Sequence, residues 1–300
     1  MLFYTKPDWT ALVKNNISVV IPNYNRSDLI GRAINSVLSQ TLPAREVIVV
    51  DDGSTDSSRE FISANYPDVT LLTQENKGVS SSRNRGIRQA SGDWIALLDS
   101  DDEWQPEKLE RQYDAWKAQP QYKIIHTNES WIRNGEPLRQ LKKHQKFGGY
   151  IYSHCLPLCV MSPSSIIVHK DIFLQLGLFN ENYPVCEDYD MWLRICASYP
   201  VLFLDEELII KYGGHEDQLS RKMFGMDRFR ILALENILNS ANLSPDDRKA
   251  TIMELGKKID IYLKGARKHD NTQFVERFRE IKDKYEEYFP STMTSTEAAQ

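Results

Sequence analysis

Two carboxylates separated by a single residue are the most chemically informative feature of this chain of 300 residues. Asp99 and Asp101 follow the apolar run 94–98 (WIALL), which predicts a buried strand that ends in a polar turn. An oxygen-rich turn of this kind can bind a hard divalent cation, Mn²⁺ or Mg²⁺, which would stabilise a diphosphate leaving group. A solvated acidic turn would show the same pattern, so these two residues alone leave both interpretations open.

A second acidic turn follows a second apolar run in the same way. The segment 51–54 (DDGS) comes directly after the run 47–50 (VIVV). A carboxylate at this place can accept a hydrogen bond from a base N–H or from a ribose hydroxyl. Asp, Gly and Ser also favour turns for reasons of backbone conformation. The coincidence of two such turns favours a functional site more than either turn does alone.

A third acidic pair, Glu187 and Asp188, lies at the start of a helix predicted for 188–197. A carboxylate can act as a general base that takes the proton of an acceptor hydroxyl during an in-line displacement. Acidic residues are also favoured at a helix N-terminus by the helix dipole, and the two roles are compatible. Trp192 in the same helix either forms the floor of an acceptor site or belongs to the core.

Alternating strands and helices are needed to bring these acidic groups together. Apolar runs predict strands at 17–21, 47–50, 69–72 and 94–98. The intervals predict helices, with Ser27 and Asp56 as caps of the first two and a third helix at 79–90. This alternation predicts an α/β fold with a Rossmann-like, mostly parallel sheet that has helices on both faces. Ligands bind at the carboxyl ends of such strands, so we expect both acidic turns at one edge of the sheet.

The pattern loosens in the second half of the chain. We predict a helix at 106–118, strands at 166–168, 201–204 and 208–212, and helices from 217 onward, restarting at a cap signal at 244–246. These elements predict a catalytic domain over 1–240, with a nucleotide-binding half at about 16–110 and an acceptor half at about 111–240. A helical C-terminal extension follows over 241–300, and its last residues are expected to be disordered.

Composition limits the class of protein. With 41% hydrophobic and 26% charged residues the chain can bury a sizeable core, and its net charge of -5 argues against a nucleic-acid partner. No apolar run reaches the ~18 residues of a membrane span, and the N-terminus has no secretory signal pattern. We therefore expect a cytoplasmic protein, and contact with the inner face of the membrane is compatible with this. The four cysteines lack the spacing of zinc sites and are expected to be reduced thiols.

A short basic stretch has two interpretations. It consists of Arg139, Lys142, Lys143 and Lys146. The stretch is either a solvated loop, or it attracts a phosphate-bearing acceptor or an anionic bilayer. In the second case a peripheral membrane contact would be part of the protein's function.

Several segments in fixed order resemble one enzyme family. They are ISVVIPNYNRSDLIGRAINSVLSQ, VIVVDDGSTDSS, ENKGVSSSRNRGI and DWIALLDSDDEW, and they cover about 16–110. Together they resemble the nucleotide-sugar half of the inverting family 2 glycosyltransferases, which have the GT-A fold. The segment 187–194 (EDYDMWLR) resembles the ED motif of that family. The resemblance implies a hexosyltransferase-like enzyme of the kind found in polysaccharide biosynthesis. Such an enzyme moves a sugar from a nucleotide-sugar, here expected to be a UDP-sugar, to a carbohydrate or lipid-linked acceptor with inversion.

The resemblance also implies roles for individual residues on the donor side. Those expected to bind the nucleotide are Pro22, Asn23, Tyr24, Asp52, Arg83, Asp99 and Ser100. Within this set, Asn23 and Tyr24 would line the base and ribose pocket, and Asp52 would hold the base. Arg83 would help to bind the nucleotide, and Asp99 would contact the ribose or the metal's surroundings.

The resemblance assigns the remaining roles to the metal and acceptor sides. Asp101 would bind the divalent cation, Mn²⁺ or Mg²⁺, together with His215, although His215 is equally well interpreted as a surface-loop histidine. Asp188 would be the general base, and Glu187 would position the acceptor or tune Asp188. Trp192 would contribute to the acceptor site unless it belongs to the core.

Two other functions are weighed against this one. A sugar nucleotidyltransferase would be expected to carry a Gly-rich loop with a basic residue after its first strand, where this chain has PNYNRSD. A non-catalytic nucleotide-sugar-binding protein would keep the first half and lose the base, and Glu187 with Asp188 argues against it. Neither a dinucleotide-binding nor a P-loop glycine motif occurs.

Overall fold

The computed structural model describes residues 16–214, 225–269 and 273–289. The predicted metal ligand His215 lies outside these described residues. By its internal contacts the chain divides into two compact units, Met1–Lys222 and Met223–Gln300. Each unit has its own apolar core.

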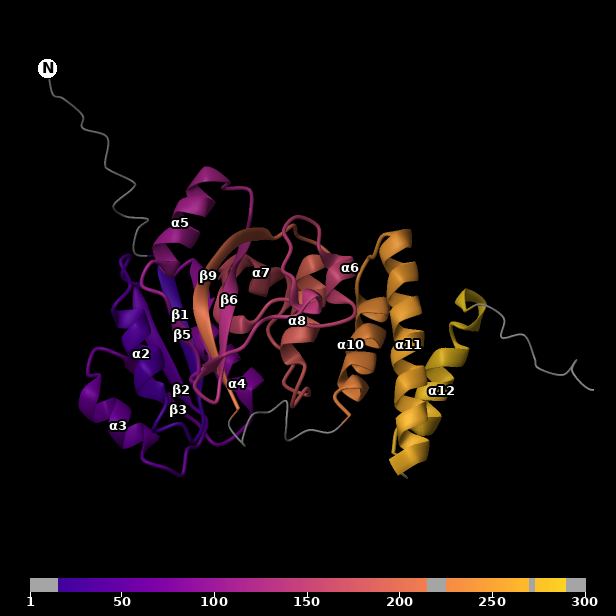
Figure 1. Ribbon diagram of the computed structural model, residues 1–300, viewed down its shortest axis with the longest axis horizontal. Coiled ribbons are helices and arrows are strands. Elements are labelled where there is room, and N and C mark those ends of the chain that lie inside the picture. The colour runs from indigo at the N-terminus through magenta and orange to yellow at the C-terminus, as the bar shows by residue number, and fades with distance from the viewer. Residues whose placement is uncertain (1–15, 215–224, 270–272, 290–300) are drawn as a thin grey trace, which may run out of the picture. The chain divides into compact units, whose positions relative to one another are not determined.

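One mixed sheet organises the first unit (Figure 1). Its strands are β1 (Ile17–Asn23), β2 (Glu46–Asp51), β3 (Thr70–Thr73), β4 (Trp94–Leu97), β5 (Glu103–Trp104), β6 (Ile124–Arg133), β7 (Glu136–Pro137), β8 (Ile166–His169) and β9 (Leu202–Gly213). They lie in the order β3-β2-β1-β4-β8-β6-β9-β5, and β7 pairs with β6. The first four strands are mutually parallel, β8 is antiparallel to both its neighbours, and β6 and β9 are parallel to each other.

Helices connect and cover these strands. They are α2 (Ile30–Leu38), α3 (Ser58–Asn65), α4 (Val79–Gln89), α5 (Lys108–Ala118), α6 (Tyr152–Cys155), α7 (Lys170–Leu176) and α8 (Glu187–Cys196), with 3₁₀ turns η1 (Lys142–His144) and η2 (Pro163–Ser165). Figure 1 shows α2 and α3 on one side of the strands and α4 on the other. The predicted α/β fold, with a mostly parallel sheet and helices on both faces, is confirmed, and the antiparallel strands β5, β7 and β8 make the sheet mixed.

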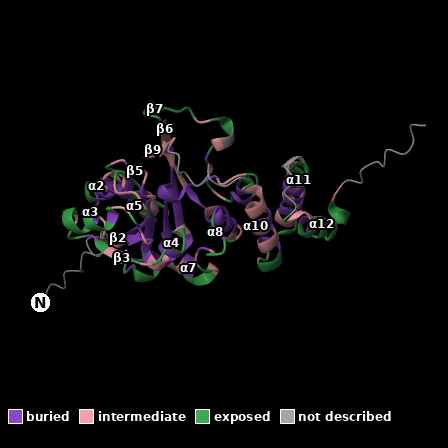
Figure 2. Cartoon of the chain, turned by 90° about the horizontal axis from the view of Figure 1, so that it is seen from below, coloured by how far each residue is buried: buried purple, intermediate pink, exposed green. Residues whose placement is uncertain are grey.

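The alternation of side chains along β1 and β2 divides the core into two layers. Val19 and Val49 belong to one apolar cluster together with Ile34 of α2, and each such burial contributes roughly 1.5–3 kcal/mol. Val20 faces α4 instead, where a Cβ on Gly86 would lie only 2.3 Å from its Cγ1. Glycine at this position therefore allows α4 to approach the sheet closely. The strands β1, β2 and β4 are almost wholly buried between these layers, and Figure 2 shows the centre of the sheet in the buried colour.

Two predicted strand ends are wrong in an informative way. β1 continues through Pro22 and Asn23, where the sequence predicted a stop. It pairs with β4 only as far as Val20, so one side of the strand beyond that point has no ladder that a proline would interrupt. The predicted strands 201–204 and 208–212 are one strand, β9, because three extra residues are accommodated at two register shifts on either side of Asn128 of β6.

Three further details depart from the predictions. α2 begins at Ile30, and Ser27 does not cap it; the Ser27 amide donates instead to Asp56 Oδ2 at 3.0 Å. The ten-residue strand β6 was not predicted, because polar residues such as His126 and Glu129 interrupt its apolar pattern. Lys146 lies buried at the end of the predicted basic loop, paired with Glu129 at 3.1 Å, and is therefore not solvated.

The second unit is helical. It consists of α10 (Asp227–Ser240), α11 (Pro245–His269), α12 (Val275–Asp283) and the 3₁₀ turn η3 (Glu286–Tyr288). α11 begins where predicted: the Asp247 amide donates to Ser244 Oγ at 3.1 Å. The division by contacts groups α10 with this unit, while the functional boundary at residue 240 stays a prediction. Among the described helices, none combines the length and apolar character that crossing a membrane requires.

Candidate functional site

The predicted site residues converge on one edge of the sheet. β1, β2 and β4 are parallel, and the register aligns Asn23 with Asp51 at their carboxyl ends. Since β8 is antiparallel to β4 and to β6, the strands β6 and β9 run in the same direction as β4. Both acidic turns therefore lie at this edge, together with the ends of β6 and β9.

The turn after β2 is held by a compact hydrogen-bond network. Asn23 Nδ2 donates to Asp51 Oδ1 at 3.0 Å and to Ser54 Oγ at 3.3 Å. The Ser54 amide donates to Asp51 Oδ2 at 3.0 Å, and Gly53 adopts a positive φ of 76° within the turn. Within the described chain, the buried Oδ1 of Asn23 accepts no hydrogen bond. This oxygen is a buried acceptor that the described residues leave unsatisfied, at the place where the nucleotide is expected to bind.

Asp52, predicted to hold the base, is occupied by the protein itself. Its Oδ1 accepts hydrogen bonds from Gln74 Nε2 at 2.7 Å and from the Lys77 amide at 3.0 Å. Its Oδ2 accepts from the Gly78 amide at 2.8 Å, and the residue is 3% exposed. The carboxylate therefore fixes the chain that leads into α4, and it shapes the pocket in this way whether or not it contacts a base.

The other predicted nucleotide contacts differ in accessibility. Tyr24 follows β1 and is 45% exposed, so a ligand can reach its ring. Pro22 lies inside the strand opposite Val50 and is buried. Ser100 is buried in the turn after β4, where its side chain is less accessible than the two carboxylates beside it.

Arg83 joins the two acidic motifs that the sequence places far apart. Its Nη1 donates to Glu187 Oε1 at 2.6 Å, and its Nη2 donates to Asp99 Oδ1 at 2.7 Å. The guanidinium is 3% exposed and lies 5.4 Å from the ring centroid of Phe179. Arg83 was predicted to bind the nucleotide, and here it bridges α4, the turn after β4 and the start of α8. No sequence pattern signals a contact between residues this distant.

The charges around this bridge are strongly coupled. Burial alone would lower the pKa of Arg83, but Asp99 and Glu187 outweigh it and raise that pKa above its ordinary value. Burial, and then the neighbouring Asp188, raise the pKa of Glu187 to about 7, against the opposing effect of Arg83. The pKa of Glu187 is therefore close to neutral pH, where its carboxyl group can both gain and lose a proton.

Asp188 opens α8 as the half-exposed neighbour of this buried bridge. Its Oδ1 accepts a hydrogen bond from the Tyr189 amide at 2.7 Å, and its Oδ2 accepts one from Cys159 Sγ at 3.1 Å. Burial, and then Asp188, raise the pKa of the Cys159 thiol well above its ordinary value, so the thiol stays protonated and can donate. The thiol has a single proton, for which Asp188 Oδ2 and the Met161 carbonyl, 3.2 Å from Sγ, are both acceptors, so the predicted reduced cysteine lies in place to orient the candidate base.

Trp192 occupies the core. It is 1% exposed, and its Nε1 donates to the Met161 carbonyl at 2.8 Å. This placement matches the core alternative, since a ring this deeply buried offers no face to an acceptor. Trp192 supports α8 from below and so helps to hold Asp188 in place.

The turn after β4 concentrates negative charge. The Asp101 carbonyl accepts a hydrogen bond from Arg32 Nη2 at 2.6 Å, and Asp102 Oδ2 accepts one from Ser164 Oγ at 2.6 Å. Burial, with smaller contributions from Asp101 and Asp99, raises the pKa of Asp102 to about 8 against the opposing effects of Lys211 and the Ser164 hydrogen bond. The turn is therefore a place where an added positive charge would be stabilised.

Lys211 of β9 is the cation that faces this turn, and the sequence analysis missed it. Its Nζ lies 4.0 Å from Asp102 Oδ2. Burial would lower the pKa of Lys211, but Asp102 and Glu129 outweigh it and raise that pKa above its ordinary value. A charged residue within the apolar run of β9 is the signal that could have found it.

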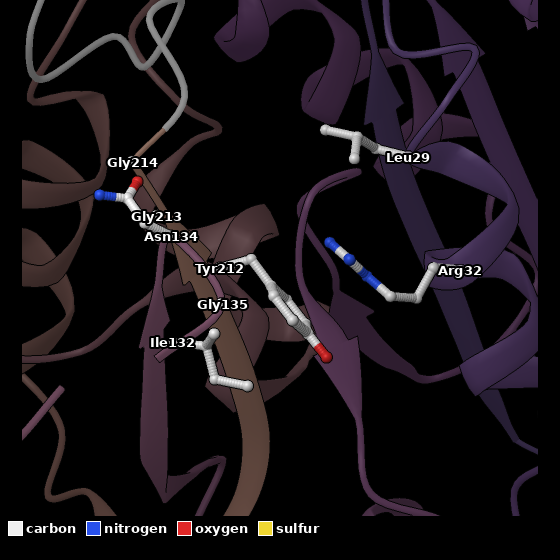
Figure 3. Close-up of a pocket in the computed structure, with 8 residues that line it drawn as sticks. All are labelled: Leu29, Arg32, Ile132, Asn134, Gly135, Tyr212, Gly213 and Gly214. Carbon is white, nitrogen blue, oxygen red and sulfur yellow. The ribbon is translucent and has the colours of Figure 1, made fainter. Parts of the chain in front are cut away.

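A cavity of about 360 Å³ lies between the start of α2 and the ends of β6 and β9 (Figure 3). It is lined by Leu29, Arg32, Ile132, Asn134, Gly135, Tyr212, Gly213 and Gly214. The Arg32 guanidinium carbon lies 3.6 Å from the centroid of the Tyr212 ring, and the Tyr212 hydroxyl donates to Glu103 Oε2 at 2.6 Å. This stack connects α2 to β9 and fixes the arginine that holds the Asp101 carbonyl.

The residues of the turn fit a divalent cation whose remaining ligands come from a bound substrate. The described residues contain no group of three or more His, Cys, Asp and Glu side chains arranged to hold a metal ion. Mg²⁺ and similar ions are commonly held by one or two carboxylates together with substrate phosphates, so an all-protein cage is not required. Asp99 and Asp101 have the carboxylate oxygens that such an arrangement would use, although one oxygen of Asp99 already accepts a hydrogen bond from Arg83.

The fold and the site define an α/β transferase of the GT-A type, with an acidic turn after β4 and an acidic pair at the start of α8. The family model described as "Glycosyl transferase family 2" matches residues 18–173. The chain therefore belongs to glycosyl transferase family 2, a family of inverting enzymes that use nucleotide-sugar donors.

Curated relatives support this membership. An uncharacterized glycosyltransferase of Rickettsia conorii is 34% identical over 214 residues, which cover 69% of this chain and 35% of the relative. Chondroitin synthase of Escherichia coli is 32% identical over 196 residues, which cover 61% of this chain and 27% of that enzyme. The chain thus spans about a third of the length of these relatives.

Solved structures show the same fold. TarS 1-349 of S. aureus in complex with UDP-GlcNAc has a TM-score of 0.61 at 17% identity and covers 91% of this chain and 92% of its own. The mannosyltransferase PcManGT of Pyrobaculum calidifontis, in complex with GDP-Man and Mn²⁺, has a TM-score of 0.56 at 15% identity. It covers 91% of this chain and 84% of its own.

Proposed function

We propose that this protein transfers a sugar from a UDP-sugar to an acceptor hydroxyl with inversion, in a reaction that depends on a divalent cation. The Arg83 bridge carries the proposal. It ties Asp99, on the side expected to bind the donor, to Glu187, which adjoins the candidate base. One buried guanidinium therefore sets the relative position of the two halves that an in-line displacement must align.

Asp188 is the general base in this proposal. A half-exposed carboxylate at the start of α8 can reach an acceptor hydroxyl and take its proton as the hydroxyl oxygen attacks the anomeric carbon. The Tyr189 amide and the Cys159 thiol each donate to one carboxylate oxygen and restrict its rotation. Glu187, held by Arg83, lies next to it and positions the acceptor.

Asp99 and Asp101 would hold the divalent cation together with oxygens of the donor diphosphate, and His215 is the further ligand that we propose. When bound, Mn²⁺ or Mg²⁺ supplies positive charge against the leaving nucleoside diphosphate. Lys211 adds a fixed positive charge next to the same turn. Asn23 offers a buried acceptor oxygen to the nucleotide, and Tyr24 offers an exposed ring.

The proposed donor and acceptor classes rest on the relatives of this chain. One structural relative binds UDP-GlcNAc and another binds GDP-Man, so the fold accommodates both nucleotides. A carbohydrate or lipid-linked acceptor, as in polysaccharide biosynthesis, is proposed from the resemblance to chondroitin synthase. A lipid-linked acceptor would place the enzyme at a membrane surface.

Donor-dependent release of UDP tests the proposal. The purified chain is incubated with a panel of UDP-sugars, with and without Mn²⁺, and slow donor hydrolysis reports activity without the true acceptor. We expect release from one donor, dependence on Mn²⁺, and a loss of at least about a hundredfold in Asp188→Asn.

A matched variant and a binding measurement separate the outcomes. Asp114→Asn, an exposed acid on α5, should release UDP at the wild-type rate. A thermal shift with each donor is recorded in parallel. Donor binding with no release from any UDP-sugar, even when candidate acceptors are added, would favour a binding-only protein. No binding to any UDP-sugar would refute the UDP assignment and direct the panel to GDP- and dTDP-sugars.

A further inference from the structure

We infer that residues 138–145, here named the basic arm, dock the protein on an anionic lipid surface. The arm follows β7 and includes η1. Figure 2 shows the segment after β7 as an exposed ribbon that stands away from the strands. This inference goes beyond the proposed transfer reaction and does not depend on it, because lipid binding can be measured without any donor.

The arm is anchored near both ends. The Leu138 amide donates to the Trp131 carbonyl at 2.7 Å, and the ring centroids of Trp131 and His144 lie 4.6 Å apart. Just beyond the arm, Lys146 forms a buried ion pair with Glu129 at 3.1 Å. These contacts hold the backbone of the arm near both of its ends. The exposed side chains of the arm therefore start from a fixed backbone.

Those outward side chains combine apolar and basic groups. Leu138 is 42% exposed and Leu141 is 61% exposed. Arg139 and Lys142 are exposed as well, and neither forms an ion pair within the described residues. A leucine held in water costs free energy that burial in the acyl boundary of a bilayer would recover.

The local charge also favours an anionic surface. From Pro137 to Lys170 the chain contains no Asp or Glu, although the whole protein has a net charge of -5. Basic residues near an anionic leaflet are attracted to it, and the arm itself contributes no acid, although the exposed Glu136 directly before it opposes part of that attraction. A soluble polyanion would bind the basic groups but would not bury the exposed leucines. The combination of basic and apolar side chains therefore favours a bilayer.

Co-sedimentation with vesicles tests the inference on the full chain. Vesicles of phosphatidylcholine alone are compared with vesicles that also contain phosphatidylglycerol. We expect binding to the anionic vesicles only, weakened about tenfold or more in Leu138→Ser/Leu141→Ser and in Arg139→Gln/Lys142→Gln.

Matched controls remove the same chemistry elsewhere. Leu174→Ser removes a leucine that is 76% exposed on α7, and Lys117→Gln/Lys257→Gln removes two exposed lysines. Both should bind as wild type does, and all variants should melt at the wild-type temperature. The inference is overturned if wild type ignores anionic vesicles, or if the leucine variant binds unchanged. It is also overturned if soluble polyphosphate abolishes binding and only the charge variant is impaired, since the partner would then be a polyanionic acceptor.

Discussion

At the scale of single residues, the candidate base depends on neighbours that differ in chemistry. Asp188 accepts one hydrogen bond from the Tyr189 amide and one from the Cys159 thiol. The amide belongs to the helix and cannot be varied by substitution, whereas the thiol can. Cys159 is therefore the residue through which the orientation of the base can be probed.

Replacing Cys159 should separate its role as donor from its volume. Cys159→Ser keeps a donor and should retain the wild-type kcat within about threefold. Cys159→Ala removes the hydrogen bond to Asp188 and should lower kcat about fivefold, which corresponds to roughly 1 kcal/mol. UDP release from the identified donor measures both effects. Equal kcat in the serine, alanine and wild-type proteins would mean that the thiol does not orient the base.

The pH dependence of thiol alkylation checks the same contact. Because burial and Asp188 raise the pKa of Cys159, the reactive thiolate is scarce at neutral pH. Alkylation of Cys159 by iodoacetamide, followed by peptide mass spectrometry, should therefore be slow at neutral pH and should still be accelerating above pH 9. Cys159 alkylation that already reaches a plateau near neutral pH would contradict the raised pKa.

At the scale of secondary-structure elements, Arg83 is the connection between α4, the turn after β4 and α8. Arg83→Lys keeps the charge, but a single ammonium cannot reproduce two separate guanidinium contacts with Asp99 and Glu187. We expect a loss of about 3 kcal/mol in the free energy of unfolding and a fall in kcat of at least about tenfold.

The split between kinetic parameters distinguishes this bridging role from the predicted nucleotide contact. A lost bridge should lower kcat, whereas a lost contact to the nucleotide alone should raise KM for the donor and leave kcat unchanged. Arg88→Lys, an exposed arginine on the same helix, serves as the control and should match wild type in stability and in both parameters.

The buried ion pair between Glu129 of β6 and Lys146, just beyond the basic arm, is a second such connection. It should control how the free energy of unfolding changes at acidic pH. Burial alone would raise the pKa of Glu129, but Lys146, Lys211 and hydrogen bonds from Trp131 and Ser162 outweigh it and lower that pKa from 4.5 to about 2. A lowered carboxyl pKa stabilises the folded state fully above pH 4.5, and the stabilisation is lost as pH falls through about 2.

Glu129→Gln should therefore cost about 3 kcal/mol at neutral pH and flatten the decline of stability below pH 4.5. Denaturant unfolding at a series of pH values measures both. Glu206→Gln, which breaks the exposed pair with Arg111, should change the curve little. A Glu129→Gln protein with the wild-type stability and the wild-type acid slope would show that the buried pair contributes nothing.

At the scale of the whole molecule, the position of the domain boundary can be tested by truncation. The contact division ends the first unit at Lys222, whereas the sequence predicted a domain that ends at residue 240 and so includes α10. The apolar face of α10 packs against α11, with Ile231 and Leu234 fully buried. Separating the two helices would expose that face, and each exposed side chain would cost roughly 1.5–3 kcal/mol.

We therefore expect the chain 1–222 to unfold cooperatively and to bind the donor, and the chain 1–240 to aggregate. Size-exclusion chromatography and thermal melting with and without the UDP-sugar measure this. A monomeric 1–240 chain, combined with an unfolded 1–222 chain, would favour the boundary predicted from the sequence.

The sequence by itself determined the class of the protein and much of the donor-side architecture. Apolar runs followed by acidic turns depend on local patterning, so the parallel strands and the segments 51–54 and 99–101 could be located without coordinates. Sequence order also located the acidic pair Glu187 and Asp188, for which an acceptor-side role is proposed. These features share one property, because each is encoded within a few consecutive residues.

Only the tertiary structure decided how these motifs act on one another. It linked Arg83 to Glu187 across 104 positions of sequence, brought Lys211 to the acidic turn and placed the Cys159 thiol against Asp188. It also buried Lys146 within a stretch that the sequence shows only as basic. Such pairings arise from the packing of distant elements, and buried charges acquire their partners from that packing, which no local pattern records.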